Sequence, residues 1–155
     1  DVSVSIKENA SSAGRVTSLI LDQSISSTRL EWQMLLCLAG REAERHRYRD
    51  ISIGCSGDLN QWQLLADLYL RNGMGSLYYA APTSEDQWRH NVKVIEDLQH
   101  QQENMLREFF SANEEALSAI EATLLEKKYL HGKPLEALLE RVVITKNMPC
   151  PTEMK

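Results

Sequence analysis

Acidic and polar side chains are concentrated in residues 40–59, which read GREAERHRYRDISIGCSGDL. Leucine-rich helical patterns precede this segment from Thr28 and follow it from Asp58, so we expect a glycine-containing loop between two packed helices. Asp58 is the residue most suited to chemistry. It can be an N-cap that accepts a hydrogen bond from a backbone amide, or a carboxylate that completes a metal site whose other ligands lie elsewhere. The local sequence leaves both interpretations open.

Other catalytic patterns are missing from the sequence. No Gly-x-x-x-x-Gly-Lys-Ser/Thr occurs, so the chain alone does not hydrolyse ATP through a Walker phosphate loop. No Gly-x-Ser-x-Gly supports a serine hydrolase. The Gly73-Met74-Gly75 segment is interpreted as a helix stop and turn, because no strand precedes it. No two histidines stand at i, i+4, so no two-histidine helical zinc motif exists among His46, His90, His100 and His131.

Length and charge narrow the function classes. The chain has 155 residues, enough for one domain with a real core, and its 43% hydrophobic and 25% charged residues are ordinary for a globular protein. The formal net charge is −5, and the one basic cluster is interleaved with acidic residues. We therefore expect no nucleic acid partner. The basic cluster consists of Arg41, Arg45, Arg47 and Arg49.

The number and spacing of the cysteines and the length of the apolar runs indicate the cellular compartment. Cys37, Cys55 and Cys150 are an odd number without a Cys-x-x-Cys pair, which favours neither a disulfide framework nor a cysteine zinc site. We expect a reducing compartment, either the cytoplasm or a stromal or matrix-like space. No run approaches the roughly 18 apolar residues of a membrane span, and no signal peptide is apparent. The chain begins at Asp1 in mid-pattern, so we expect further residues before it.

The periodicity predicts a mainly α fold. Residues 2–6 alternate between apolar and polar side chains, and residues 16–21 are rich in side chains that favour strands. Together they predict a small N-terminal β-hairpin over residues 1–22. Helix-start patterns predict a bundle of about five helices over residues 28–143. We expect one domain over residues 1–145 and a loose tail over 146–155. The expected helix starts are Thr28-x-x-Glu31, Asp58-x-x-Gln61, Ser84-x-x-Gln87, Asn113 and Pro134, the last after a turn at His131 to Pro134.

Helical spacing also predicts which side chains face inward. In the first helix these are Leu30, Met34, Cys37 and Leu38, and in the second Leu65, Leu68 and Tyr69. The long third helix should bury Val92, Ile95, Met105, Leu106 and Phe109. Its polar middle, residues 99–103, leaves a thin apolar seam, so we expect it to be partly exposed or covered by partner subunits.

Four segments together resemble a known family. GREAE at Gly40, IGCSGDL at Ile53, Gly73-Met74 and LLEKKYLHGKPLEALL at Leu124 are similar to the C-terminal peptidase domain of the membrane-anchored, ATP-dependent zinc metalloproteases of the FtsH family. That family reads Gly-Arg-x-Ala-Glu, Thr-Gly-Ala-x-Asn-Asp-Leu, Gly-Met-Ser and Leu-Leu-Glu-Lys-Glu-Thr-Leu-x-Gly-x-Glu-Leu. The order and approximate spacing agree along nearly the whole chain, and residues 1–20 resemble the strands that follow the family's zinc helix.

The resemblance implies a zinc metallopeptidase domain. In the family a helix with His-Glu-x-x-His supplies two zinc ligands and the general base, and the aspartate of the Asn-Asp-Leu motif is the third ligand. That aspartate corresponds to Asp58. Glu44 is interpreted from its motif position as a residue that orients a ligand histidine. The implied partners are a protein or peptide substrate, an ATPase domain or partner chain, and further copies in a homo-oligomer, which is a hexamer in the family.

The departures from the family pattern support a second hypothesis. His-Glu-x-x-His is not in this sequence and would lie about twenty residues before the point that matches Asp1. Cys55, Gly57 and Trp62 replace the usual alanine, asparagine and alanine, and a tryptophan here should disturb a site for substrate and metal. The alternative is therefore a catalytically inactive pseudopeptidase that acts as an oligomerisation or regulatory module. On either hypothesis we expect this chain alone to be inactive.

Overall fold

The computed structural model describes residues 2–5, 15–18 and 26–149. This part of the chain is mainly α, as the sequence predicts, with five α-helices, one 3-10 turn and three short strands. Its internal contacts divide it into two compact units, one formed by residues 1–23 and 109–144 and the other by residues 24–108 and 145–155. Among the described residues, no helix has both the length and the apolar character needed to cross a membrane.

Helix α1 (Ser27–Tyr48) opens the larger unit and is longer than predicted. Ser26 is its N-cap and accepts a hydrogen bond from the Arg29 amide, so the capping box predicted at Thr28 is wrong. The loop predicted from Gly40 is also wrong as far as Tyr48, because a single glycine costs a helix only about 1 kcal/mol. The helix ends at Arg49, whose backbone is left-handed with φ 58°.

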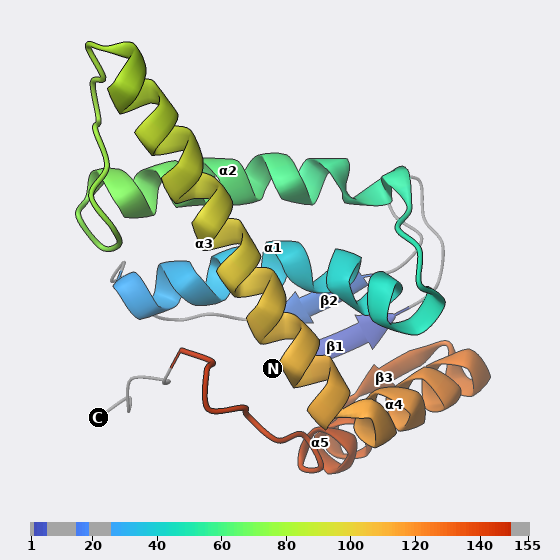
Figure 1. Cartoon of the computed structure of the whole chain (residues 1–155). Helices are drawn as coiled ribbons and strands as arrows, with labels where there is room; N and C mark the ends of the chain where they lie inside the picture. Colours follow the sequence, from blue (N-terminus) through green and yellow to red (C-terminus); the bar gives the residue numbers. More distant parts are fainter. Residues whose placement is uncertain (1, 6–14, 19–25, 150–155) are drawn as a thin grey trace. The chain divides into compact units, whose positions relative to one another are not determined.

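Helix α2 (Ser56–Arg71) follows the 3-10 turn η1 (Ile53–Cys55) and packs along α1 (Figure 1). The residue at its N-cap position is Cys55, so Asp58 lies in the first turn and is not the cap. The buried face also differs from the prediction, because Leu68 is exposed. The face that packs inward consists of Trp62, Ala66, Tyr69 and Leu70.

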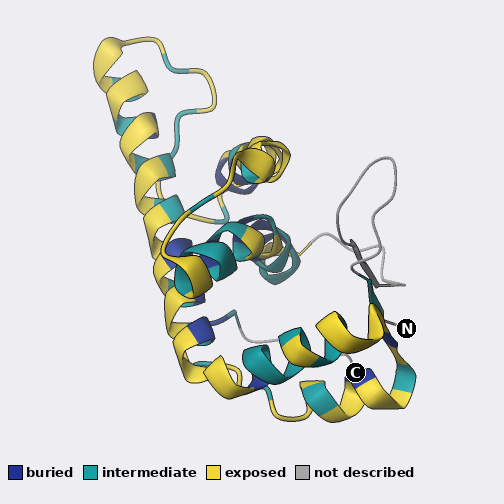
Figure 2. Cartoon of the chain, turned by 90° about the vertical axis from the view of Figure 1, so that its right-hand side faces the viewer, coloured by how far each residue is buried: buried dark blue, intermediate teal, exposed yellow. Residues whose placement is uncertain are grey.

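Helix α3 (Glu85–Ala112) crosses the α1–α2 pair (Figure 1) and begins as predicted, with Ser84 accepting a hydrogen bond from the Gln87 amide. Figure 2 shows that its first half is mostly exposed. Val92 is exposed there, contrary to the prediction. Asn91 is buried and exchanges two hydrogen bonds with the backbone of Tyr79, which holds the preceding extended segment against the helix.

The polar middle of α3 is partly exposed, as predicted, at His100 and Gln101, but its last two residues are buried within the chain. Gln102 and Glu103 are only 3% and 4% exposed. Gln102 bonds to a side chain of α2, and Glu103 to side chains of α1. These polar side chains therefore belong to the interface between helices within one chain, and they need no partner subunit to cover them.

The smaller unit contains the sheet and the last two helices. Strand β1 (Val2–Ser5) pairs antiparallel with β2 (Arg15–Ser18), as predicted. The strands do not form an isolated hairpin, because β3 (Tyr129–His131) pairs with the other edge of β1. The turn predicted from His131 is therefore wrong at that residue. Gly132, with φ 56°, starts the final helix α5 (Gly132–Leu139) directly after β3.

Helix α4 (Glu114–Lys127) begins after Asn113, as predicted, although the Asn113 side chain does not cap it. The Asn113 side chain is buried and instead binds both the amide and the carbonyl of Val143, and also the Phe109 carbonyl. It therefore fixes the chain after α5 against the α3–α4 junction. In the larger unit, the described part of the predicted tail includes Met148, which is buried.

Candidate functional site

Asp58 lies in the first turn of α2 with an exposed carboxylate. It forms no hydrogen bond or ion pair with any residue that the structure describes. The interpretation of Asp58 as an N-cap is therefore wrong, and its one local role is the favourable interaction of a negative charge with the helix dipole. The carboxylate is open to solvent and to a ligand.

The electrostatic neighbour of Asp58 is Cys37 on α1. The pKa of the Cys37 thiol is raised above its ordinary value, first by burial and second by the negative charge of Asp58. Cys55 is close in sequence, and its thiol donates to the Ser52 carbonyl at 3.3 Å. Within the ranges that the structure describes, no three His, Cys, Asp or Glu side chains are grouped closely enough to hold a metal ion. Asp58 can bind a metal only if other ligands join it from elsewhere.

Glu44, the second residue singled out by the sequence, lies near the end of α1 and does not bond to Asp58. One of its carboxylate oxygens accepts from the Ser52 amide at 2.9 Å, and the other accepts from the Ser52 hydroxyl at 2.9 Å. Ser52 is the N-cap residue of η1, the turn that leads into α2. Glu44 therefore fixes the connection that precedes Asp58.

Trp62 stands one turn after Asp58, and it faces the core. It has no exposed surface, and its indole Nε1 donates to Gln102 Oε1 at 2.8 Å. Trp62 is therefore a core side chain, and the expectation that it disturbs a substrate or metal site stays a prediction. The indole fastens α2 to α3, so the helix that carries Asp58 is anchored one turn after that residue.

A buried ionic network lies between α1 and α3. Glu42, which is 1% exposed, accepts from Arg45 at 2.8 Å and from Arg107 Nε at 3.3 Å. Glu103 accepts from Arg41 at 3.2 Å and from Arg107 at 3.3 Å. We call the five side chains together the Glu42–Glu103 network. Both carboxylates are saturated by arginines, so this network is suited to holding helices together.

Sequence analysis missed this network because it treated the Arg and Glu residues after Gly40 as a self-neutralising loop. One signal could have revealed it. Glu42 follows Leu35 by seven residues and Leu38 by four, so it continues the buried stripe of α1 once the helix is extended through Gly40. A charged residue on a buried stripe implies a buried partner of opposite charge.

No protein-family model matches this chain, and no curated protein matches it at a significant level. The resemblance to the FtsH-type peptidase domain stays a prediction that rests on the motifs at Gly40, Ile53, Gly73 and Leu124.

Proposed function

We propose that this chain is a divergent peptidase-like domain of the FtsH type, in which Asp58 is one zinc ligand and the other ligands come from a His-Glu-x-x-His helix outside these residues. The observation that carries the proposal is the contrast between the unpaired Asp58 carboxylate and the firmly anchored helix that bears it. The carboxylate has no partner among the described residues. The helix beneath it is anchored one turn later by Trp62 and Gln102. A ligand held on a rigid element but left unpaired is what a metal site requires.

The chemistry of the proposed site is peptide hydrolysis. A bound zinc ion would polarise a peptide carbonyl and lower the pKa of its bound water. Asp58 contributes an oxygen donor of the kind that zinc accepts. Both oxygens of Glu44 are occupied by Ser52. We therefore assign Glu44 an indirect role, in which it fixes the connection before α2 and thereby the position of Asp58.

A pseudopeptidase remains the second candidate, and a different observation favours it. The Glu42–Glu103 network joins α1 to α3 through arginine–carboxylate pairs, so the helical scaffold is held together by its own side chains. On this proposal the helical scaffold serves oligomerisation or regulation, and Asp58 is a charge at a helix start.

Zinc content separates the two candidates. The measurement is zinc per chain by mass spectrometry in the longest natural form of the protein and in its Asp58→Asn variant. A matched control is Asp86→Asn, because Asp86 is also an exposed aspartate in the first turn of a helix, α3. The peptidase proposal expects close to one zinc in the natural form and in Asp86→Asn, with zinc greatly reduced in Asp58→Asn.

Two results would decide against the peptidase proposal. Zinc absent from the natural form would leave the pseudopeptidase as the better function. Zinc retained by Asp58→Asn would remove Asp58 from the ligand set. A parallel incubation of the chain alone with a stably folded test protein should give no degradation, because the chain has no Walker loop with which to drive unfolding.

A further inference from the structure

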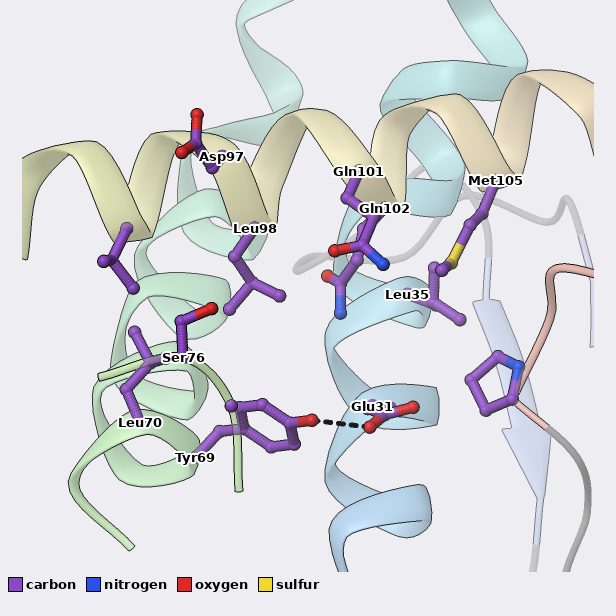
Figure 3. Close-up of a pocket in the computed structure, with 13 residues that line it drawn as sticks. Glu31, Leu35, Tyr69, Leu70, Ser76, Asp97, Leu98, Gln101, Gln102 and Met105 are labelled. Carbon is purple, nitrogen blue, oxygen red and sulfur yellow. Dashed lines mark hydrogen bonds between the residues drawn. The ribbon is translucent and has the colours of Figure 1, made fainter. Parts of the chain in front are cut away.

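The larger unit contains a cavity of about 190 Å³ near the end of α2, on the side away from Asp58. Figure 3 shows its walls, which come from α1, α2, α3, the chain after Asn72 and Pro149 of the C-terminal segment. Leu35, Leu70, Leu98 and Met105 supply the apolar surface. The cavity has room for several water molecules or for a small organic group, since one water occupies about 30 Å³ of liquid volume.

One carboxylate faces this cavity with an unused oxygen. Glu31 Oε1 accepts from the Tyr69 hydroxyl at 2.6 Å (Figure 3). Burial, followed by the Glu31 interaction, raises the pKa of Tyr69 above its ordinary value, so the phenol stays protonated and donating. The other oxygen, Oε2, has no partner among the residues that the structure describes. It can accept a hydrogen bond from a ligand.

A buried amide supplies the complementary group. The indole of Trp62 is a donor only, so it must bond to the oxygen of Gln102 and thereby fixes which way that amide is turned. The Gln102 side chain points from α3 into the cavity (Figure 3) and is 97% buried, because its exposed fraction is 3%. Its Nε2 has no partner in the described part of the chain. Two N–H donors therefore point into the cavity unused.

The cavity lining carries negative charge. It contains no Lys, Arg or His side chain. Asp97 belongs to the wall, but its carboxylate points away from the cavity in Figure 3 and binds Lys93. Glu31 is therefore the charge that a ligand meets. A cation is favoured at its Oε2, and an anion is disfavoured.

We propose that this cavity binds an alkylammonium group joined by a short apolar chain to a hydrogen-bond acceptor. The ammonium would bind Glu31 Oε2, the acceptor would bind Gln102 Nε2, and the chain would lie on Leu35, Leu98 and Met105. A lysine residue of a peptide and a small free amino amide share this chemistry. The site includes neither Asp58 nor any metal, so it is independent of the function proposed above.

Gly75 keeps the cavity open. A Cβ atom at Gly75 would lie 2.9 Å from the Tyr69 ring and 3.0 Å from Leu70. Both neighbours line the cavity, so Gly75→Ala should push them into it. This variant tests the space without removing a charge.

The test is a titration of the chain with small amines, in which nuclear magnetic resonance spectra monitor the tryptophan indole N–H signals. The chain has three tryptophans, and the Trp62 signal reports on Gln102 directly. The probes are Nα-acetyl-lysine methylamide and 5-aminopentanamide, a free amine with an amide acceptor, each at concentrations up to about 10 millimolar. The neutral control is Nα-acetyl-norleucine methylamide. We expect the lysine derivative to shift Trp62 and to leave the exposed Trp88 unchanged, with weaker or no binding of the norleucine derivative.

The variants separate the charge from the fold. Glu31→Gln still accepts from Tyr69 and should weaken binding at least about tenfold, since hydrogen bonds to charged groups are the stronger ones. Asp97→Asn, a matched carboxylate of the same wall that points away, should leave binding unchanged. Binding of 5-aminopentanamide but not of the lysine derivative would make the ligand a small free amino amide. No Trp62 shift with either amine, or equal shifts with the neutral control, would overturn the proposal and leave a water-filled cavity.

Discussion

Asp58 and Glu42 are acidic residues of the same packed helix pair, and their surroundings are opposite. Glu42 is buried on α1 and holds two arginines, and Asp58 is exposed on α2 and has no protein partner among the described residues. A buried carboxylate must be paired because its desolvation is expensive, whereas an exposed one can remain free at little cost. The first is committed to holding the helices, and the second is available for a ligand.

Glu44 stands between these two cases. Glu44 is partly exposed, and both of its carboxylate oxygens accept hydrogen bonds from one residue, Ser52, in the connection before α2. Three acidic residues within the stretch first singled out from sequence thus have three different tasks. The motif resemblance predicts roles for Asp58 and Glu44, and the packing of α1 against α3 gives Glu42 its role.

The largest expected effect is on Glu42. Glu42→Ala breaks ion pairs whose carboxylate is fully buried, and it leaves Arg45 and Arg107 with Glu103 as their remaining carboxylate. We expect the free energy of unfolding to fall by about 3 kcal/mol, the low end for a broken buried pair, because both arginines are partly exposed. Urea unfolding followed by tryptophan fluorescence measures it, because all three tryptophans lie in the larger unit. Asp58→Ala is the control and should cost less than about 1 kcal/mol. Equal losses in both variants would remove the contrast between the two carboxylates.

A smaller loss is expected when the neutral anchor of α2 is broken. Trp62→Phe removes the indole donor and leaves the buried oxygen of Gln102 unsatisfied, which should cost about 2 kcal/mol. Adding Gln102→Leu to Trp62→Phe should recover part of this loss, because two apolar partners leave no polar group unpaired. If the double variant is less stable than the sum of the single changes predicts, the indole–amide bond is not what fastens α2.

Glu44 should give a local effect. Glu44→Ala removes the acceptor of the Ser52 amide, and an exposed side-chain hydrogen bond of this kind is worth about 1 kcal/mol or less. Hydrogen exchange should become faster at Ser52, with little change in the middle of α1. Ser52→Ala keeps the amide and its acceptor but removes the hydroxyl contact, so its effect on exchange should be smaller. Faster exchange throughout α1 would show that Glu44 supports the helix as a whole.

Much of the fold followed from helical periodicity, and the errors have specific physical causes. The stripe of Leu30, Met34 and Leu38 is buried as predicted. The sequence predicts a loop from Gly40, because glycine is a weak helix former. The helix continues to Tyr48 because the residues that follow Gly40 favour a helix. Strand β3 was missed because three residues carry almost no periodic signal, and its partner β1 is distant in sequence.

The candidate site was only half predictable. Motif position singled out Asp58, and the structure adds that the residue lies in the first turn without a capping bond. The buried polar side chains could not be placed, because Gln102 and Glu103 look like a solvated helix face until their partners on α2 and α1 are known. A polar residue on a long helix is therefore a poor guide to exposure when a side chain of another helix can pair with it.

The smallest expected effect concerns the charge of Asp58 itself. Burial is the main cause of the raised pKa of the Cys37 thiol, and the Asp58 carboxylate adds to it because two negative charges repel. Asp58→Asn should therefore lower that pKa without removing the burial contribution. More thiolate is then present at mildly alkaline pH, so Cys37 should react somewhat faster with iodoacetamide.

The thiol measurement uses chains in which Cys55 and Cys150 are replaced by serine, so that Cys37 is the only cysteine. Asp86→Asn in the same background removes an equal charge from another helix start and should leave the rate unchanged. The rate of Asp58→Asn should exceed that of its parent most clearly below the thiol pKa, where the thiolate fraction is small. Identical rates for Asp58→Asn and its parent at every pH would mean that solvent screens the Asp58 charge from the Cys37 thiol.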